Sequence, residues 1–199
     1  MSETIRRSWL LVAVSRGDQI AQAVGCGADV IVLDLVELVP EQDKAAAREN
    51  MQTAIHAARA GGAEVFAQID PGLLYDDLHA CVWPGLSGMV VARAESARQI
   101  VKIDVLLSRL EKERSIPPQT VQLVAALETA AGHHAAYDIA RASKRMWGLT
   151  LGRADLVMDL RPEPSGEIHL WSYLMQRLIT IAAAASVTPI GAWWRAPDR

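Results

Sequence analysis

The chain alternates short apolar runs with longer helical stretches along its whole length. The runs are rich in Val, Ile and Leu, and most lack the alternation of apolar and polar positions that marks a half-exposed strand. A continuous apolar run is typical of a parallel strand that helices cover on both faces. We place seven such strands, at residues 9–14, 30–35, 64–70, 88–93, 121–127, 146–151 and near 189–194.

Between the strands the pattern predicts helices, for example over residues 19–24 and in the Ala-rich stretch that begins near Asp43. Strands that alternate with helices form βαβ units with right-handed crossovers and parallel pairing. Two architectures fit this order, a (β/α)8 barrel and an open doubly wound sheet. A GxGxxG motif does not follow the first strand, which disfavours a dinucleotide-binding sheet.

The number of strands falls one short of a complete barrel. The chain has 199 residues, whereas a full barrel usually has about 250. We therefore expect one domain over residues 1–199, an α/β fold of the TIM-type (β/α)8 barrel class that lacks the usual eighth βα unit. Either the eighth strand is absent, or the N-terminal segment or a neighbouring subunit closes the seam, because an open strand edge invites pairing with another chain.

Composition and charge narrow the function classes. Hydrophobic residues make up 51% of the chain and charged residues 22%, the profile of a globular protein. The net charge is −3 with scattered Lys and Arg, which disfavours a nucleic-acid partner. Since we find neither a signal peptide nor an apolar stretch of about 18–20 residues, we expect a cytoplasmic protein without a membrane partner. Cys26 and Cys81 lack CxxC spacing, and we expect two reduced, buried thiols.

Candidate chemistry lies at the carboxyl ends of the strands, where the loops of a parallel barrel converge. A carboxylate in an apolar barrel mouth is costly unless it is paired or binds a metal. The polar residues that end the first six runs are Ser15, Arg16, Asp34, Glu37, Gln68, Asp70, Arg93, Glu95, Glu128, Thr129, Arg153 and Asp155.

Glu128 and Asp155 form the best candidate metal site. They end adjacent strands, so their carboxylates can approach one another, and a hard divalent cation would relieve their repulsion. Mg²⁺ is commonly held by one or two protein carboxylates together with water and substrate oxygens. The spacing alone leaves an alternative open, in which either acid forms a salt bridge with Arg93 or Arg153.

Histidines and tryptophans give weaker signals. His133 and His134 are adjacent, so their side chains point in different directions on a helix, and we expect a solvated helix entry there rather than a metal site. Trp193 and Trp194 are expected to fill a barrel end or a subunit contact. The prolines and glycine of residues 161–166 predict an extended loop.

Several segments together resemble the citrate lyase β-subunit/HpcH–HpaI aldolase family. The most specific is Ala126-Leu127-Glu128-Thr129-Ala130-Ala131-Gly132, which is similar to the family segment L-I-E-T-A-A-G. The other segments follow in family order and cover nearly the whole chain; they are Arg7-Ser8 and residues 32–39, 44–48, 68–71, 85–96 and 152–156.

The resemblance implies a usually oligomeric TIM-type barrel that binds Mg²⁺ through a glutamate and an aspartate, which correspond to Glu128 and Asp155. It also implies cleavage or formation of a C–C bond in a 2-oxo acid or in a citryl-, malyl- or related acyl-CoA. A bound metal would act there as Lewis acid and template. The chain departs from the family at Gln68, where an arginine is usual, and at Arg93, where a lysine is usual. Val36 and Ala154 replace acidic residues, and the final family segment is absent.

The sequence therefore predicts a Mg²⁺-dependent carbon–carbon lyase that acts on a small oxo- or hydroxy-acid or its coenzyme A thioester, as a homo-oligomer. The expected catalytic residues are Glu128, Asp155 and Arg93, and the first two are also the expected metal ligands. The expected substrate-binding residues are Gln68, Asp34, Glu37, Arg16 and Arg153. The alternative is a catalytically impaired relative that serves as a binding or assembly subunit, and other barrel chemistries, such as phosphoenolpyruvate-type mutases, form a third class.

Overall fold

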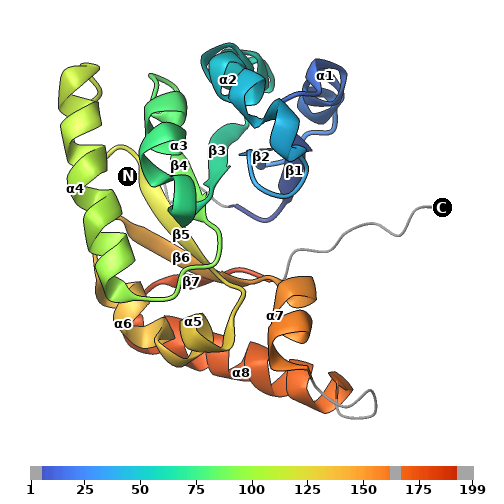
Figure 1. Cartoon of the computed structure of the whole chain (residues 1–199), viewed down its shortest axis with the longest axis vertical. Coiled ribbons are helices and arrows are strands. Elements are labelled where there is room, and N and C mark those ends of the chain that lie inside the picture. The colour runs from blue at the N-terminus through green and yellow to red at the C-terminus, as the bar shows by residue number, and fades with distance from the viewer. Residues whose placement is uncertain (1–5, 162–166, 192–199) are drawn as a thin grey trace. The chain divides into compact units, whose positions relative to one another are not determined.

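The computed structural model describes residues 6–161 and 167–191, which form an α/β fold (Figure 1). The strands are β1 (Trp9–Ala13), β2 (Val30–Asp34), β3 (Glu64–Ile69), β4 (Gly88–Val91), β5 (Gln122–Leu127), β6 (Met146–Leu151) and β7 (Thr188–Pro189). The α-helices are α1 (Gly17–Gly25), α2 (Lys44–Ala58), α3 (Leu74–Cys81), α4 (Ala97–Glu113), α5 (Ala130–His134), α6 (Ala136–Arg141), α7 (Arg153–Leu160) and α8 (Glu167–Ala185). Short 3₁₀ helices are η1 (Glu41–Asp43), η2 (Arg59–Gly61) and η3 (Pro71–Leu73).

The chain divides into two compact units, one of residues 1–90 and 105–122 and the other of residues 91–104 and 123–199. In each unit the order of the strands in the sheet follows their order in the chain. This order is what repeated right-handed βαβ connections produce, because each helix carries the chain back to start the next parallel strand.

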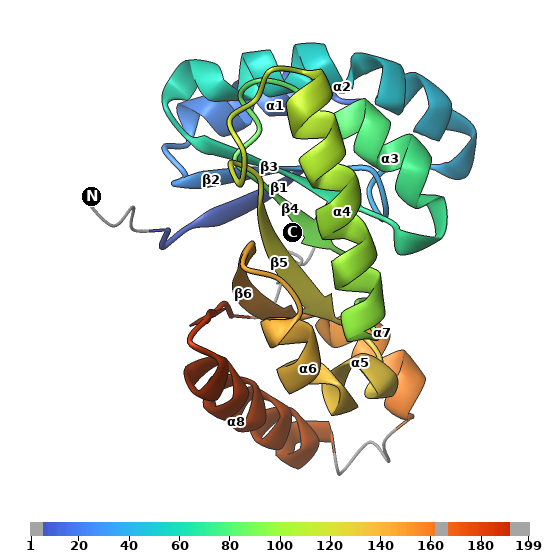
Figure 2. The same cartoon turned by 90° about the vertical axis from the view of Figure 1, so that its left-hand side faces the viewer.

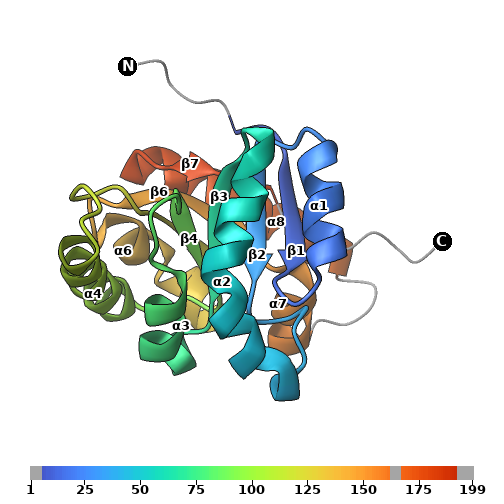
Figure 3. The ribbon, with the colours of Figure 1, turned by 90° about the horizontal axis from the view of Figure 1, so that it is seen from above.

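The first unit is built on the parallel strands β1, β2 and β3. Trp9 pairs with Val30 at one end of the β1–β2 register, and Asp34 pairs with Gln68 at the other end of β2 and β3. β2 is buried along its whole length, as expected for a strand covered on both faces. Helix α1 packs on β1, α2 on β2 and α3 on β3 (Figure 3).

The second unit contains β5 from its second residue onward, together with β6 and β7, and these strands are also parallel. Leu127 pairs with Leu151, so β5 and β6 end side by side. Helices α6 and α8 both pack against β6 (Figure 2), and α8 also contacts β7. The result is that the residues following β5 and β6 emerge at one edge of this sheet.

The alternating strands and helices predicted from the sequence are confirmed, and so is parallel pairing. Six predicted strands agree with the structure to within one or two residues at each end. The seventh is restricted to Thr188–Pro189 in the described part of the chain. Trp193, Trp194 and most of the predicted loop, residues 162–166, lie outside the described residues. Among the residues that are described, no helix is long and apolar enough to cross a membrane.

One prediction about the cysteines is wrong. Both thiols are free, but only Cys81 is buried, whereas Cys26 is exposed. Cys26 caps the end of α1 and precedes Gly27, whose positive φ of 69° turns the chain at the surface. Cys81 ends α3, and burial raises the pKa of its thiol well above the ordinary value.

Candidate metal and substrate site

Glu128 is the residue that directly follows β5 in the second unit, and its side chain is held in place from two sides. It is 1% exposed, and its Oε2 accepts a hydrogen bond of 2.7 Å from the backbone N–H of Arg93. Gly152 packs against it so closely that a Cβ at that position would lie 2.3 Å from Glu128 Cγ. The carboxylate is therefore buried in one fixed orientation.

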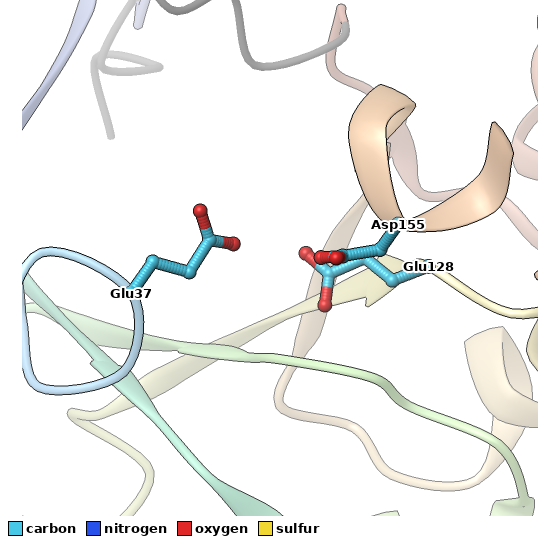
Figure 4. Close-up of side chains that lie close together, drawn as sticks. All are labelled: Glu37, Glu128 and Asp155. Atoms are coloured by element: carbon cyan, nitrogen blue, oxygen red, sulfur yellow. The ribbon is translucent and has the colours of Figure 1, made fainter. Parts of the chain in front are cut away.

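Asp155 reaches the same carboxylate from the helix that follows β6. It lies in the first turn of α7, which begins directly after Gly152, and it is exposed. One carboxylate oxygen of Asp155 and one of Glu128 lie within 4.8 Å of each other, and Figure 4 shows the two groups side by side. The positive end of the α7 dipole favours a carboxylate in this turn.

The two acids make a donor set that fits a hard divalent cation. Two carboxylates at this separation repel one another unless a proton or a cation lies between them. Mg²⁺ takes oxygen ligands and is usually held by one or two carboxylates, with its other positions open to water and substrate. The two acids meet this description, because Glu128 is buried and fixed in orientation and Asp155 is exposed to solvent.

The structure explains why residues 128–132 have the sequence Glu-Thr-Ala-Ala-Gly. Thr129 caps α5, its Oγ1 accepting a 3.1 Å hydrogen bond from the N–H of Gly132. A Cβ on Gly132 would lie 2.2 Å from the carbonyl oxygen of Ala94, so only glycine lets α5 approach the segment that carries Arg93. Sequence reasoning missed Asp159, which accepts a 2.7 Å hydrogen bond from the N–H of Ala130.

The two arginines predicted for this unit lie in different settings. Arg93 is exposed and has a positive φ of 47°, a backbone conformation that is uncommon outside glycine. This conformation accompanies the hydrogen bond from its N–H to Glu128. The guanidinium of Arg153 lies over the ring of Trp171, 5.7 Å from the ring centroid.

In the first unit, Asp34 supports the loop that follows β2. Its carboxylate accepts hydrogen bonds from the backbone N–H groups of Val36, Glu37 and Leu38, at 2.8, 3.0 and 2.5 Å. Burial raises the pKa of Asp34, while these N–H donors favour the charged form. Asp34 thus shapes the loop that presents Glu37, which is exposed.

Gln68 is the last residue but one of β3, next to the buried Ile69, and is 1% exposed. Its Oε1 is buried without a hydrogen-bond partner among the described residues. Its neighbour in register on β2 is Asp34. A buried carbonyl oxygen without a partner is costly, and Gln122 Oε1 in the same unit is in the same state.

A second buried acid in this unit stabilises the turn after β3. Asp77, 1% exposed, accepts a 2.8 Å hydrogen bond from Arg48 Nε and a 2.9 Å bond from the backbone N–H of Asp70. Asp77 was missed by the sequence analysis because it lies inside α3 rather than at a strand end.

Arg16, a predicted substrate-binding residue, is exposed, and its Nε lies 3.2 Å from Asp18 Oδ1.

The prediction of a solvated helix entry at the two histidines is wrong for His133. The two residues end α5 rather than begin it. His134 is exposed, but His133 is 4% exposed, and neither of its ring nitrogens has a hydrogen-bond partner in the described part of the chain. Desolvation, followed by the charge of Arg177, lowers the pKa of His133 to about 4.

Comparison with known proteins adds a family context to this geometry. A family model described as HpcH/HpaI aldolase/citrate lyase matches residues 7–199. The β subunit of citrate lyase from Leuconostoc mesenteroides subsp. cremoris is 29% identical over 191 residues, which cover 94% of this chain and 63% of the relative. An L-malyl-CoA/beta-methylmalyl-CoA lyase of Rhodobacter capsulatus is 28% identical over 145 residues, covering 70% of this chain and 45% of the relative.

Similar solved structures share the fold. Protein CitE from Mycobacterium tuberculosis, in complex with magnesium and pyruvate, superposes with a TM-score of 0.71 at 24% identity, covering 94% of this chain and 74% of that one. The same protein with magnesium, acetoacetate and coenzyme A gives a TM-score of 0.67 at 22% identity, covering 94% and 67%. The chain spans between 55% and 63% of the length of the citrate lyase β subunits it matches.

Proposed function

Because this chain belongs to the HpcH/HpaI aldolase/citrate lyase family, we propose that it is a Mg²⁺-dependent carbon–carbon lyase. Its substrate would be a small 2-oxo or hydroxy acid, or the coenzyme A thioester of such an acid. The observation that carries the proposal is the pair of carboxylates from Glu128 and Asp155, with oxygens within 4.8 Å. Complexes of the structural relative with magnesium and pyruvate, and with coenzyme A, support the choice of metal and substrate class.

Glu128 and Asp155 are the proposed ligands of Mg²⁺. When bound, the ion supplies Lewis acidity toward an oxygen of the substrate. The residues around it have separate tasks. The N–H of Arg93 keeps one oxygen of Glu128 engaged, so that the carboxylate cannot rotate away. Asp155 is exposed and can accept a ligand that arrives from solvent.

Anionic substrate groups require cations, and the proposed ones are the side chains of Arg93 and Arg153, with Arg16 as a further candidate. An arginine binds a carboxylate through two parallel hydrogen bonds. Asp34, Glu37 and Gln68 remain proposed substrate-binding residues of the first unit. We further propose that the chain forms a seven-stranded TIM-type barrel, assembles as a homo-oligomer and is located in the cytoplasm.

Calorimetric titration with MgCl₂, and then with pyruvate or oxaloacetate in saturating Mg²⁺, tests the site. We expect wild type to bind Mg²⁺, and Glu128→Gln to weaken binding of both metal and acid by at least about tenfold, or 1.4 kcal/mol. Glu113→Gln is the matched control, because Glu113 is an exposed acid on α4 that pairs with Arg109. Equal binding by wild type and Glu128→Gln would refute the assignment of Glu128.

A second candidate function is that of a binding or assembly subunit that keeps the fold without turnover. The uncharged Gln68, the last residue but one of β3, favours it, because an amide cannot neutralise a substrate carboxylate. Incubation with malyl-CoA and measurement of glyoxylate separates the two candidates. Glyoxylate release that is lost in Glu128→Gln supports the lyase, whereas Mg²⁺-dependent binding without release supports the second candidate.

A further inference from the structure

We infer that Asp159 is a positioning residue of the proposed metal site, which sets the separation of the Glu128 and Asp155 carboxylates. It does so by joining the helix that carries one acid to the chain segment that follows the other. All three residues belong to the second unit. The inference rests on the proposed function, because Mg²⁺ binding gives that separation its importance, and it adds a residue that contacts neither the ion nor the substrate.

The first observation is a hydrogen bond between the two segments that carry the proposed ligands. Asp159 Oδ2 accepts a 2.7 Å bond from the backbone N–H of Ala130. Ala130 is the first residue of α5 and follows Glu128 by two positions. The first N–H groups of a helix have no partner within that helix. Asp159 therefore supplies a partner from α7 and joins this helix to the segment directly after β5.

The second observation is the place of Asp159 on its own helix. Asp155 and Asp159 both lie on α7, and residues four positions apart on an α-helix share one face. The face of α7 that brings Asp155 to Glu128 (Figure 4) is thus the face that Asp159 fixes against α5, a helix that α7 contacts. If this face moved, Asp155 would move relative to Glu128.

The third observation is that apolar packing contributes little to holding α7. Leu156 is the only buried residue of this helix, all of which is described, and Met158 is 75% exposed. Most helical stability in proteins comes from the packing of an apolar face. The orientation of α7 therefore depends on contacts near its two ends. Gly152 packs against Glu128 just before the helix begins, and Asp159 provides a contact near the carboxyl end.

The separation of the two carboxylates affects divalent ions to different extents. Mg²⁺ requires a near-ideal octahedron with oxygens at about 2.0–2.1 Å, whereas Ca²⁺ accepts flexible geometry at about 2.3–2.6 Å. A helix that is free to shift should therefore weaken the binding of Mg²⁺ more than that of Ca²⁺. A general loss of folded protein would reduce the binding of both ions alike, so the ratio of the two affinities reports on positioning.

Calorimetric titration with MgCl₂ and with CaCl₂ tests the inference on wild type, Asp159→Ala, Asp159→Asn and Asp138→Ala. We expect Asp159→Ala to weaken Mg²⁺ binding about tenfold and Ca²⁺ binding by no more than about twofold. Asp159→Asn retains a carbonyl oxygen that can accept the bond from Ala130, and should largely restore the wild-type preference. Asp138→Ala is the matched control, because it removes an exposed acid from α6 in the same unit, and it should leave both affinities unchanged.

Hydrogen exchange of the Ala130 amide in metal-free protein, followed by NMR, provides a second measurement. Exchange should be faster in Asp159→Ala than in wild type, because the bond to the carboxylate is lost, and Asp159→Asn should remain close to wild type. An unchanged exchange rate in Asp159→Ala would contradict the proposed role of this hydrogen bond.

Wild type that binds Mg²⁺, together with an Asp159→Ala variant of unchanged preference for Mg²⁺ over Ca²⁺, would overturn the inference and leave the proposed lyase standing. An equal loss of preference in Asp138→Ala would also overturn it, since charge alone would then explain the effect. Wild type that does not bind Mg²⁺ would remove the proposed function and this inference together. If circular dichroism shows that Asp159→Ala does not fold, Asp159→Glu decides, because it keeps the charge and changes only the length of the side chain; an unchanged preference there would refute the inference.

Discussion

The two units use buried polar groups in opposite ways. In the first unit, Asp34 and Asp77 direct their carboxylates at backbone N–H groups and, for Asp77, at Arg48, so both acids stabilise their own surroundings. In the second unit, Glu128 lies close to a second carboxylate, that of Asp155, and His133 has no hydrogen-bond partner for its ring among the described residues. The position of an acid at a strand end therefore does not by itself make that acid a metal ligand. The groups around its carboxylate decide whether it stabilises the fold or can bind an ion.

The largest effect that we expect comes from breaking the ion pair of the first unit. Asp77→Ala leaves the guanidinium of Arg48, which is 19% exposed, without its partner, and should reduce the free energy of unfolding by about 3 kcal/mol. Urea denaturation measures this loss. If the two units differ as described, the Mg²⁺ affinity of the folded variant stays at the wild-type value, and a parallel loss of Mg²⁺ binding would contradict the division of roles.

The next effect concerns pH and His133. The folded-state pKa of about 4 lies below the ordinary value of about 6.5, so between these values the unfolded chain binds the proton and acid favours unfolding. The stability present above pH 6.5 should decline by about 3 kcal/mol as the pH falls to 4. Denaturation at a series of pH values should show a shallower decline in His133→Leu. His134→Leu, which changes the exposed neighbour, should retain the wild-type decline, and identical slopes in all three proteins would disprove the assignment.

A glycine substitution tests how tightly the carboxylate pair is held. Gly152→Ala would place a Cβ 2.3 Å from Glu128 Cγ, so the side chain must move, at a cost of about 1–3 kcal/mol in stability. Because Glu128 is displaced, Mg²⁺ affinity measured by calorimetry should fall with it. Gly17→Ala in the first unit is the control, since a Cβ there meets nothing within 4 Å. A Gly152→Ala protein with unchanged Mg²⁺ affinity would show that the close packing has no role in orienting Glu128.

The smallest effect is expected at the cap of α5. Thr129→Ala removes the hydrogen bond to the N–H of Gly132 and should lower the melting temperature through a loss of about 1 kcal/mol. Thr53→Ala, on the exposed side of α2, should have little effect or stabilise slightly, because alanine favours helix. Equal melting temperatures for wild type and Thr129→Ala would mean that the cap contributes nothing.

Much of the fold was predictable from the sequence. The continuous apolar runs located the strands, and their alternation with helices implied parallel pairing, because local burial and crossover geometry act within one βαβ unit. Cys26 was misplaced because a thiol is apolar enough to suggest a core position, while its burial depends on the turn at Gly27. His133 was misplaced because a pair of adjacent histidines gives no indication of which ring faces the interior.

The site was predictable in part. The proximity of Glu128 to Asp155 followed from their places after adjacent strands, and their carboxylate oxygens do lie within 4.8 Å of one another. The residues that hold this pair in place could not be predicted from the sequence. Asp159 reaches Ala130 from a different helix, and the N–H of Arg93 reaches Glu128 across 35 positions of sequence. Contacts of this kind depend on the register of packed elements, which has no local signature in the chain.

The amino-acid sequence by itself determined that this protein is a parallel α/β structure with acids after its fifth and sixth strands, because apolar periodicity and strand-end chemistry are properties of short segments. Only the tertiary structure decided which acids are engaged by their own backbone and which face another acid. It also decided that the oxygen of Gln68 is buried without a partner in the described structure. The physical reason is that hydrogen-bond satisfaction and desolvation depend on every group packed around a side chain, and most of those groups are distant in sequence.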